Sequence, residues 1–306
     1  MYPTSADDPR GIVVAREVEA LRAAGWSVDV VSKPPGTTAY ASQLRAMVRR
    51  LKASEYTAVH AHYGTAAILP RLYPGRFRRV VTLHGSDVTA GPRPRASRFW
   101  LQYLLSATGS LGVDAVFVQA RFMAELLPER VRRHVTVLPQ PIDLETFRPG
   151  AGTERREDVI LFLGRRHVPL KRHGLAREVV EGLGDGLRLV ALDEIPPAGI
   201  PRAMREARAA LLTSEREGMP VSVKESLVSG LPVVAVDLPG TRELADAVPG
   251  IHIAAHDPAS LRAALRRVLD EPPLEAAVVE RIRAVFRERS WDAEGHRRLL
   301  ERAYLG

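Results

Sequence analysis

Short apolar runs alternate with more polar stretches along the chain, and this pattern predicts a series of strands and helices. A helix is expected at 9–24. The apolar runs that follow are typical of strands buried on both faces of a parallel sheet. In the first half, the predicted strands are 27–32, 58–61, 80–83, 114–119 and 135–138. Strands that alternate with helices imply parallel sheets with right-handed crossover connections.

A glycine-rich and then charged segment, 149–158, interrupts this series and predicts a linker. The second series has predicted strands at 159–163, 187–192, 209–212, 232–236 and 250–254, followed by helices at 258–269, 274–288 and 291–304. A chain of 306 residues is long enough for about two domains of ordinary size. We therefore predict an α/β protein with domains at 1–150 and 151–290 and a terminal helix at 291–306.

The stretch that begins at Glu217 predicts a loop, then a helix, then a buried strand. Pro220 suits the first turn of a helix, and Gly230 suits a left-handed C-terminal cap. Glu217 is therefore expected on a loop at the helix N-terminus, with Glu225 one to two turns inside the helix. The first N–H groups of a helix lack internal partners and favour an anion.

The segment Glu217-Gly-Met-Pro-Val-Ser-Val-Lys-Glu225 resembles the E-x7-E signature of retaining glycosyltransferases of family 4, also called glycosyl transferases group 1. The resemblance extends to bacterial surface-polysaccharide enzymes. It implies the GT-B fold, in which two Rossmann-like domains with parallel sheets face each other across a cleft. It also implies that the terminal helix crosses back to the first domain. In this family the first glutamate, here Glu217, contacts the donor sugar, and the second, Glu225, holds the ribose hydroxyls of the nucleotide.

A second family motif follows the predicted strand 159–163. The passage from Gly164 and Arg165 to Lys171 resembles a G-R-x(n)-K clamp for the donor diphosphate. Open α/β sheets bind ligands just beyond the carboxyl ends of their strands, where this passage falls. The alternative is a solvent-facing lysine at a helix start. The donor-binding residues that the resemblance implies are Gly11, Gly164, Gly218, Met219, Val221, Ser222 and Glu225, beside Arg165, Lys171 and Glu217.

The first domain carries a passage, Thr82-Leu-His-Gly-Ser-Asp87, that resembles the family's T-x-H-G-x-D motif. The resemblance implies that His84 approaches the donor sugar from the domain opposite Glu217. An imidazole can offer a hydrogen bond from either ring nitrogen, depending on its tautomer. The alternative is a strand-end histidine satisfied by the backbone.

His60 and His62 point to one face of a predicted strand. A zinc site needs a further ligand, and none is evident near this pair in the sequence. We therefore interpret the pair as structural. The resembling family needs no metal because the protein supplies the cations, and the chain has no Asp-x-Asp motif. We expect no metal and no cofactor.

The N-terminus departs from the family pattern. Residues 1–5 and 11–14 resemble the loop and helix that follow the family's first strand, but the strand itself is missing from the sequence. That strand is central in a doubly wound sheet, and its loss would leave neighbouring backbone groups unpaired. We expect that the natural chain starts upstream or that this form is truncated. Gly11 would still let the backbone approach the donor phosphates.

The chain is basic, with 44 Lys and Arg residues against 36 Asp and Glu and a net charge of +8. Such a surface attracts nucleotide sugars, anionic lipid or nucleic acid. Arginines cluster at 45–50, 76–79 and 93–98, and the last cluster precedes aromatic residues at 99–103. One interpretation is peripheral contact with an anionic membrane that carries a lipid-linked acceptor; the other is an ordinary solvated surface. No helix-turn-helix, zinc-finger or RNA-binding motif is visible, so no nucleic-acid partner is expected.

The chain contains no cysteine, no signal-peptide pattern and no apolar run long enough to cross a bilayer. We expect a cytoplasmic location, with the inner face of the membrane as a further expectation. The predicted activity is sugar transfer, with retention, from a nucleotide diphosphate sugar to a glycan or lipid-linked acceptor. Alternatives are another GT-B enzyme such as a nucleotide-sugar epimerase, an inactive truncated form, or a basic binding protein.

Overall fold

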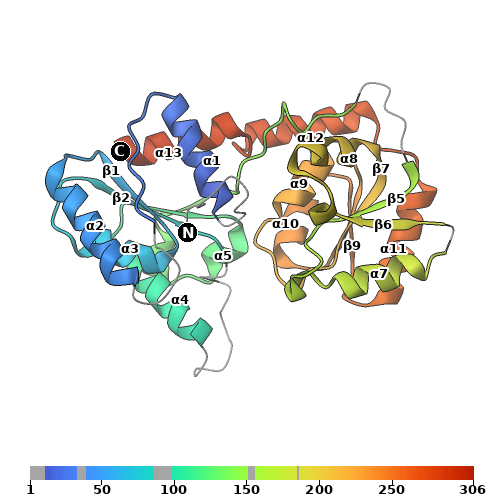
Figure 1. Cartoon of the computed structure of the whole chain (residues 1–306), viewed down its shortest axis with the longest axis horizontal. Helices are drawn as coiled ribbons and strands as arrows, with labels where there is room; N and C mark the ends of the chain where they lie inside the picture. Colours follow the sequence, from blue (N-terminus) through green and yellow to red (C-terminus); the bar gives the residue numbers. More distant parts are fainter. Residues whose placement is uncertain (1–10, 33–38, 86–87, 89–97, 151–155, 185) are drawn as a thin grey trace. The chain divides into compact units, whose positions relative to one another are not determined.

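The computed structural model describes residues 11–32, 39–85, 88, 98–150, 156–184 and 186–306 of the chain. These residues form two compact units (Figure 1). Unit 1 comprises residues 1–140 together with 294–306, and unit 2 comprises residues 141–293. The chain therefore leaves unit 1, builds unit 2 and returns to unit 1 with its last helix.

Unit 1 is built on a four-stranded parallel sheet in the order β1-β2-β3-β4. The strands are β1 (Ala58–His62), β2 (Arg78–Leu83), β3 (Ala115–Val118) and β4 (Val135–Val137). In the register of β1 and β2, His60 pairs with Val80 and His62 with Thr82. The helices of this unit are α1 (Ile12–Ala23), α2 (Ala39–Ala53), α3 (Gly64–Leu72), α4 (Arg98–Gly109), α5 (Arg121–Glu125), α6 (Glu129–Arg132) and α13 (Ala293–Leu305).

Helix α13 completes the core of unit 1, although it lies at the far end of the sequence. Its Leu300 and Tyr304 are buried in one apolar cluster with Leu21 of α1, Val80 of β2 and Phe117 of β3. In Figure 1, α13 (red) runs beside α1 (blue). Burial of such side chains from water is the main stabilising contribution that ties the returning helix to this unit.

Unit 2 has a five-stranded parallel sheet in the order β6-β5-β7-β8-β9. The strands are β5 (Arg156–Phe162), β6 (Arg188–Ala191), β7 (Ala207–Leu212), β8 (Val233–Val236) and β9 (Ile251–Ala254). The 3-10 turns are η1 (Pro169–Lys171), η2 (Leu192–Glu194) and η3 (Pro197–Gly199), and the helices are α7 (His173–Glu181), α8 (Ile200–Glu206), α9 (Val221–Val228), α10 (Pro239–Ala247), α11 (Pro258–Asp270) and α12 (Ala276–Glu288). Apolar side chains of α7 and α11 pack against this sheet, whose central strands β7 and β8 are buried along their whole length.

The predicted strand at 27–32 is wrong, since these residues form no strand in the structure. A strand exists only through ladder hydrogen bonds with a neighbour, and this segment has no ladder partner among the described strands. Its apolar pattern is satisfied in another way, because Val28 packs against the apolar cluster of unit 1. The chain here follows the core without joining the sheet.

The predicted linker at 149–158 also needs correction. Strand β5 begins at Arg156, inside that range, while residues 151–155 lie outside the described part of the chain. The charged side chains at the start of β5 are compatible with a strand because Glu157 forms an ion pair with Arg208 of β7 at 2.7 Å and Asp158 pairs with Arg188 of β6 at 2.6 Å. Among the described residues, no helix has the length and apolar character that a membrane span requires.

Candidate functional site

The two halves of the predicted donor clamp meet in unit 2. Lys171 ends the short turn η1 after β5, and Glu217 lies on the loop between β7 and α9. The Lys171 ammonium Nζ lies 2.6 Å from Oε1 of Glu217, and the side chains are 27% and 14% exposed. Sequence positions 46 residues apart are therefore brought into one ion pair at the carboxyl ends of neighbouring strands.

Backbone contacts hold this pair in place. Glu215 N donates to Leu170 O at 2.9 Å, which joins the loop after β7 to η1. The buried hydroxyl of Thr213, at the end of β7, donates to Lys171 O at 2.8 Å. These contacts fix the main chain at Lys171 and two residues before Glu217.

Helix α9 begins as the sequence predicts. Pro220 precedes the first helical residue, Val221, and Gly230 adopts a left-handed conformation after the helix with φ 84°. Glu217 thus lies on the loop before α9, and Glu225 lies inside the helix. Val221 and Ser222 are partly exposed, and their N–H groups belong to the first turn, which has no acceptor within the helix. This end of α9 can bind an anion.

Close packing requires glycine at Gly164 of the clamp motif and at Gly240, opposite Gly218 of the E-x7-E motif. A Cβ on Gly164 would lie 2.9 Å from Phe162 and 3.1 Å from the Lys171 side chain. A Cβ on Gly240, near the start of α10, would lie 1.5 Å from the carbonyl oxygen of Gly218. Gly240 was not identified from the sequence, where its Pro-Gly dipeptide signals only a turn. Helix α10 is therefore seated directly on the loop that carries Glu217, and Met219 of that loop is buried.

Two arginines follow Gly164, and only Arg166 forms ion pairs with carboxylates among the described residues. Arg166 pairs with Glu194 at 2.9 Å and with Asp193 at 3.4 Å. Arg165 is exposed and forms no ion pair within the part of the chain that the structure describes. Its charge is accordingly available to an anionic ligand.

Lys224 lies in the interior of α9, and the sequence assigned it no role in the site. Its side chain is fully buried, and burial lowers its pKa to about 7 although the neighbouring Glu225 acts to raise it. A lysine on the inward face of a short amphipathic segment is the signal that could have found it.

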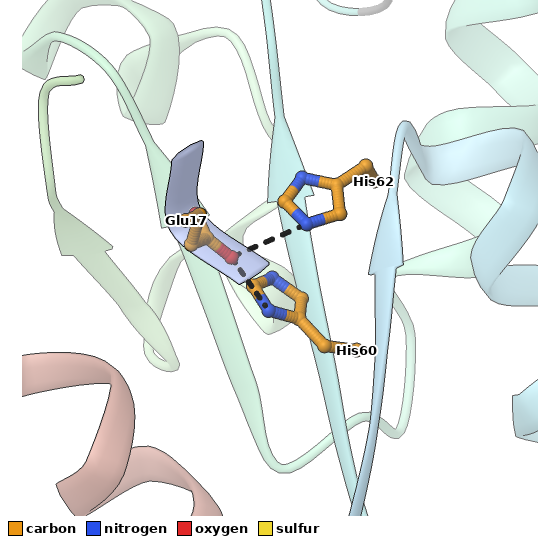
Figure 2. A group of neighbouring side chains, drawn as sticks. All are labelled: Glu17, His60 and His62. Atoms are coloured by element: carbon orange, nitrogen blue, oxygen red, sulfur yellow. Dashed lines mark ion pairs between the residues drawn. The ribbon is translucent and has the colours of Figure 1, made fainter. Parts of the chain in front are cut away.

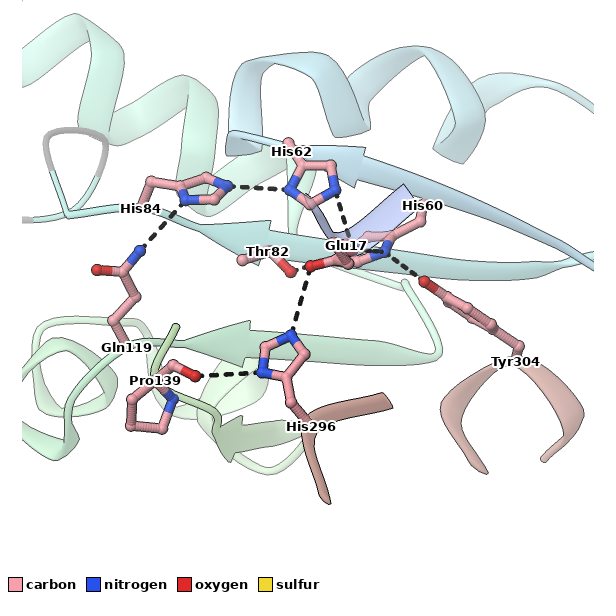
Figure 3. Close-up of polar contacts among 9 residues, drawn as sticks. All are labelled: Glu17, His60, His62, Thr82, His84, Gln119, Pro139, His296 and Tyr304. Atoms are coloured by element: carbon pink, nitrogen blue, oxygen red, sulfur yellow. Dashed lines mark hydrogen bonds and ion pairs between the residues drawn. The ribbon is translucent and has the colours of Figure 1, made fainter. Parts of the chain in front are cut away.

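His84 lies in unit 1, just after β2, within a network of polar side chains (Figure 3). Its Nε2 lies 3.0 Å from His62 Nδ1, and its Nδ1 lies 3.2 Å from the side-chain amide nitrogen of Gln119. Burial lowers the pKa of His84 to about 3, as does the neighbouring His62. His84 is therefore a neutral imidazole with both ring nitrogens in contact with protein groups. Ser86 and Asp87 of the same motif lie outside the described residues.

The network continues to a buried carboxylate from α1. Glu17 Oε1 lies 3.3 Å from His62 Nε2 and 3.4 Å from His60 Nδ1, while Oε2 lies 3.4 Å from His296 Nε2 of α13 (Figure 3). Burial alone would raise the pKa of Glu17, but His62, His296 and His60 together lower it well below its usual range. No further ligand lies near His60 and His62 in the sequence, and the fold brings Glu17 to them. Glu17 lies four residues before the apolar Leu21 and therefore on the same, inward face of α1. This spacing could have indicated from the sequence that Glu17 is buried.

Gly11 caps the N-terminus of α1 in the left-handed conformation, with φ 72°. A glycine is favoured there because side chains rarely adopt this backbone region. Gly11 and His84 belong to unit 1, whereas the other predicted site residues belong to unit 2.

The basic cluster that led to the membrane interpretation is only partly described. Arg93 and Arg95 lie outside the described residues, whereas Leu101 and Leu105 of α4 are exposed to 56% and 38%. Tyr103 is anchored, because its hydroxyl donates to Leu126 O at 2.7 Å. Contact with an anionic membrane stays a prediction.

Comparisons with known proteins follow the same division of the chain. A model described as Glycosyltransferase Family 4 matches residues 11–146, and one described as Glycosyl transferases group 1 matches residues 178–285. A D-inositol 3-phosphate glycosyltransferase of Frankia alni is 32% identical over an alignment of 183 residues and covers 45% of this chain and 45% of its own. Another, from Acidothermus cellulolyticus, is 26% identical over 295 residues, covering 78% of this chain and 64% of its own. The chain thus spans about half to two thirds of the length of these curated relatives.

Solved structures resemble the fold over nearly the whole chain. Sucrose-phosphate synthase from Thermosynechococcus elongatus has a TM-score of 0.71 at 18% identity, covering 96% of this chain and 92% of its own. HepE from Anabaena, in complex with UDP and glucose, has a TM-score of 0.69 at 12% identity, covering 93% and 88%. At these identities the likeness concerns the fold, and it confirms the predicted α/β architecture of the GT-B type.

Proposed function

Since the chain belongs to the group 1, family 4 glycosyltransferases of the GT-B fold, we propose that it transfers a sugar from a nucleotide diphosphate sugar to a glycan or lipid-linked acceptor, with retention. The observation that carries this proposal is the contact of Lys171 with Glu217 beside the N-terminus of α9. This contact places a cation, a carboxylate and exposed N–H groups at one point of unit 2.

The proposed chemistry stabilises charge on the leaving group. As the sugar–phosphate bond breaks, negative charge develops on the nucleoside diphosphate. Lys171, Arg165 and the N–H groups of Val221 and Ser222 would receive this charge, which is the electrostatic contribution that matters most in such reactions. These protein cations replace a metal ion at the diphosphate, so we propose that transfer is metal-independent.

The ion pair suggests how donor binding prepares the site. Without donor, the Lys171 ammonium is held at 2.6 Å by Glu217. A bound diphosphate would draw the ammonium away, because its charge is larger than that of one carboxylate. Glu217 would then be free to accept hydrogen bonds from the sugar hydroxyls. Glu225, farther along α9, would hold the ribose, and Gly164, Gly218 and Met219 would line the donor.

A role for His84 toward the sugar is part of the proposal, and its contacts set a condition. Both ring nitrogens have protein partners, His62 and Gln119. A hydrogen bond to a sugar hydroxyl therefore requires that one partner give way, and the Gln119 amide is the weaker contact at 3.2 Å. Gly11 would approach the donor phosphates through its backbone.

The nature of the donor and acceptor is proposed by analogy. HepE was solved with UDP and glucose, and TarM of S. aureus with UDP and α-GlcNAc-glycerol. UDP is accordingly the first nucleotide to test. We further propose an acceptor presented at the inner face of an anionic membrane.

The test compares thermal stabilisation by UDP, GDP, ADP and their sugar conjugates. A ligand at about 100 times its Kd stabilises the native state by about 2.7 kcal/mol and so raises Tm. We expect a shift with one nucleotide, and Lys171→Ala should weaken that binding by about tenfold or more, the effect of losing a charge-assisted contact. Lys52→Ala, which removes an exposed lysine of α2, is the charge-matched control and should bind like wild type.

Two results would contradict the proposal. One is the absence of any shift with every nucleotide tested. The other is an equal shift in wild type and Lys171→Ala, which would place nucleotide binding away from the clamp.

A further inference from the structure

Three side chains of unit 1 converge on one point in the manner of metal ligands (Figure 2). Glu17 comes from α1, and His60 and His62 come from one face of β1. Each offers one ligand atom, and these atoms all lie within 4.8 Å of one another. We propose that Glu17, His60 and His62 bind a divalent transition-metal ion, for which Zn²⁺ is the test ion. This inference does not rest on the proposed transferase activity.

Two of the three distances between ligand atoms suit a tetrahedral ion, and the third is within 4.8 Å. With metal–ligand bonds of about 2.0–2.1 Å, the ligand atoms of a tetrahedral zinc site lie roughly 3.3 Å apart. Glu17 Oε1 lies 3.3 Å from His62 Nε2 and 3.4 Å from His60 Nδ1. A carboxylate with two imidazoles is an established zinc ligand set that leaves a fourth position open.

The second nitrogen of each histidine is already oriented. His60 Nε2 contacts Thr82 Oγ1 at 2.8 Å, and His62 Nδ1 contacts His84 Nε2 at 3.0 Å (Figure 3). Metal-binding histidines typically use their other nitrogen in this way. Zinc binding by His62 Nε2 requires His62 Nδ1 to donate to His84 Nε2, and His84 Nδ1 then to donate to the Gln119 amide oxygen, which a turn of that amide supplies. The other two nitrogens, Nδ1 of His60 and Nε2 of His62, face Glu17, and Nδ1 of His60 also contacts the Tyr304 hydroxyl.

The electrostatics favour a cation at this point. The side chains of Glu17, His60 and His62 are 9%, 11% and 15% exposed. In the part of the chain that the structure describes, Glu17 pairs only with histidines and not with lysine or arginine. A buried carboxylate needs a compensating charge.

His296 and Tyr304 add two groups from α13. His296 Nδ1 lies 3.2 Å from Pro139 O, which can only accept, so Nδ1 donates there. Its Nε2 lies 3.4 Å from Oε2 of Glu17, so His296 contacts the carboxylate oxygen that the proposed ion does not use. The Tyr304 hydroxyl, 2.7 Å from His60 Nδ1, would give way to the ion or fill its fourth position.

The site would join three segments that are distant in sequence. Glu17 lies on α1, the histidine pair on β1, and His296 on the returning helix α13. An ion bound there would connect the first helix of unit 1 to its sheet. Its role would be structural and separate from the proposed diphosphate clamp of unit 2.

The test uses the full chain without a histidine tag, stripped with a chelator and then titrated with Zn²⁺ against a chromophoric chelator. Wild type should retain one zinc per chain after gel filtration. Glu17→Gln and His62→Gln should each weaken zinc binding by more than tenfold, because each removes a ligand while keeping a similar shape. His134→Gln changes an exposed histidine of the same unit and should bind like wild type.

Two further measurements keep the test decisive. Circular dichroism checks that each variant is folded, and the visible absorption of bound Co²⁺ reports nitrogen ligation in wild type even if a variant fails to fold. Wild type that retains no zinc and shows no Co²⁺ band would overturn the proposal. Glu17 and the histidines would then be held together by hydrogen bonds and ion pairs without a metal. Equal retention of zinc by Glu17→Gln, His62→Gln and wild type would also overturn it. Nucleotide binding by unit 2 would be unaffected by either result.

Discussion

Single residues in this protein are shifted from their ordinary chemistry by burial. Lys224 is fully buried in α9, and burial lowers its pKa to about 7 from the ordinary 10.5 of a lysine. The folded state therefore disfavours the charged lysine. Between these two pKa values the unfolded chain binds more protons than the folded chain, so stability increases as pH rises from about 7 toward 10.

We predict that Lys224 makes unfolding of unit 2 strongly pH-dependent. From pH 7 to pH 9, this residue should add about 2 kcal/mol to the free energy of unfolding. Lys224→Met keeps the length of the side chain but cannot titrate, so its stability should change less over the same range. Urea unfolding of both proteins at the two pH values checks this. Parallel pH profiles for wild type and variant would show that Lys224 does not titrate in this window.

In unit 2, helix α10 and the loop of Glu217 approach each other closely because a glycine lies at their contact. Helix α10 meets the loop of Glu217 where Gly240 faces the Gly218 carbonyl, and a side chain there would overlap that oxygen. Thr241 fixes the same end of α10 by hydrogen bonds, because its hydroxyl donates to Val236 O at 2.8 Å and accepts from Leu238 N at 3.0 Å. The position of the loop thus depends on a helix that follows it in the chain.

We predict that Gly240→Ala destabilises unit 2 by about 1–3 kcal/mol, because overpacking forces the backbone to move. It should also weaken nucleotide binding, since the displaced loop carries Glu217. Gly174→Ala in α7 is the matched control: a Cβ there meets nothing within 4 Å, and alanine should stabilise the helix by up to about 1 kcal/mol. Denaturant unfolding and the nucleotide thermal shift measure both effects. Similar behaviour of the two variants would refute the close contact.

The whole chain is organised by the return of its last helix. Residues 294–306 belong to unit 1, although residues 141–293 form unit 2 before them. Leu300 is 1% exposed in the core of unit 1, whereas Leu305, on the same helix, is 69% exposed. The core of unit 1 therefore includes residues that follow unit 2 in the sequence.

We predict that Leu300→Ala lowers the stability of unit 1 by about 2–5 kcal/mol, as for other large-to-small core substitutions. Leu305→Ala should stay within about 0.5 kcal/mol of wild type, because its side chain is exposed. Hydrogen exchange followed by mass spectrometry can read each unit separately. Peptides from β1 and β2 should lose protection in Leu300→Ala, while those from β7 and β8 should not. Loss of protection in unit 2 alone would contradict the assignment of α13 to unit 1.

The sequence by itself determined the features that depend on local pattern. Strands β7 and β8, the N-terminus of α9 and the left-handed cap at Gly230 follow from apolar runs and from proline and glycine at fixed positions. The placement of Glu217 on the loop and Glu225 in the helix followed as well. Such features depend on backbone preferences over a few residues, so neighbours in sequence are sufficient to specify them.

Only the tertiary structure decided which distant residues meet. The segment 27–32 has an apolar pattern that fits a strand, yet a strand also needs a ladder partner, which its own sequence cannot supply. The contact of Lys171 with Glu217, the position of Gly240 against Gly218, and the meeting of Glu17 with His60 and His62 all join separate elements. Their distances depend on how sheets and helices pack, because packing and not local periodicity sets which side chains share a buried space.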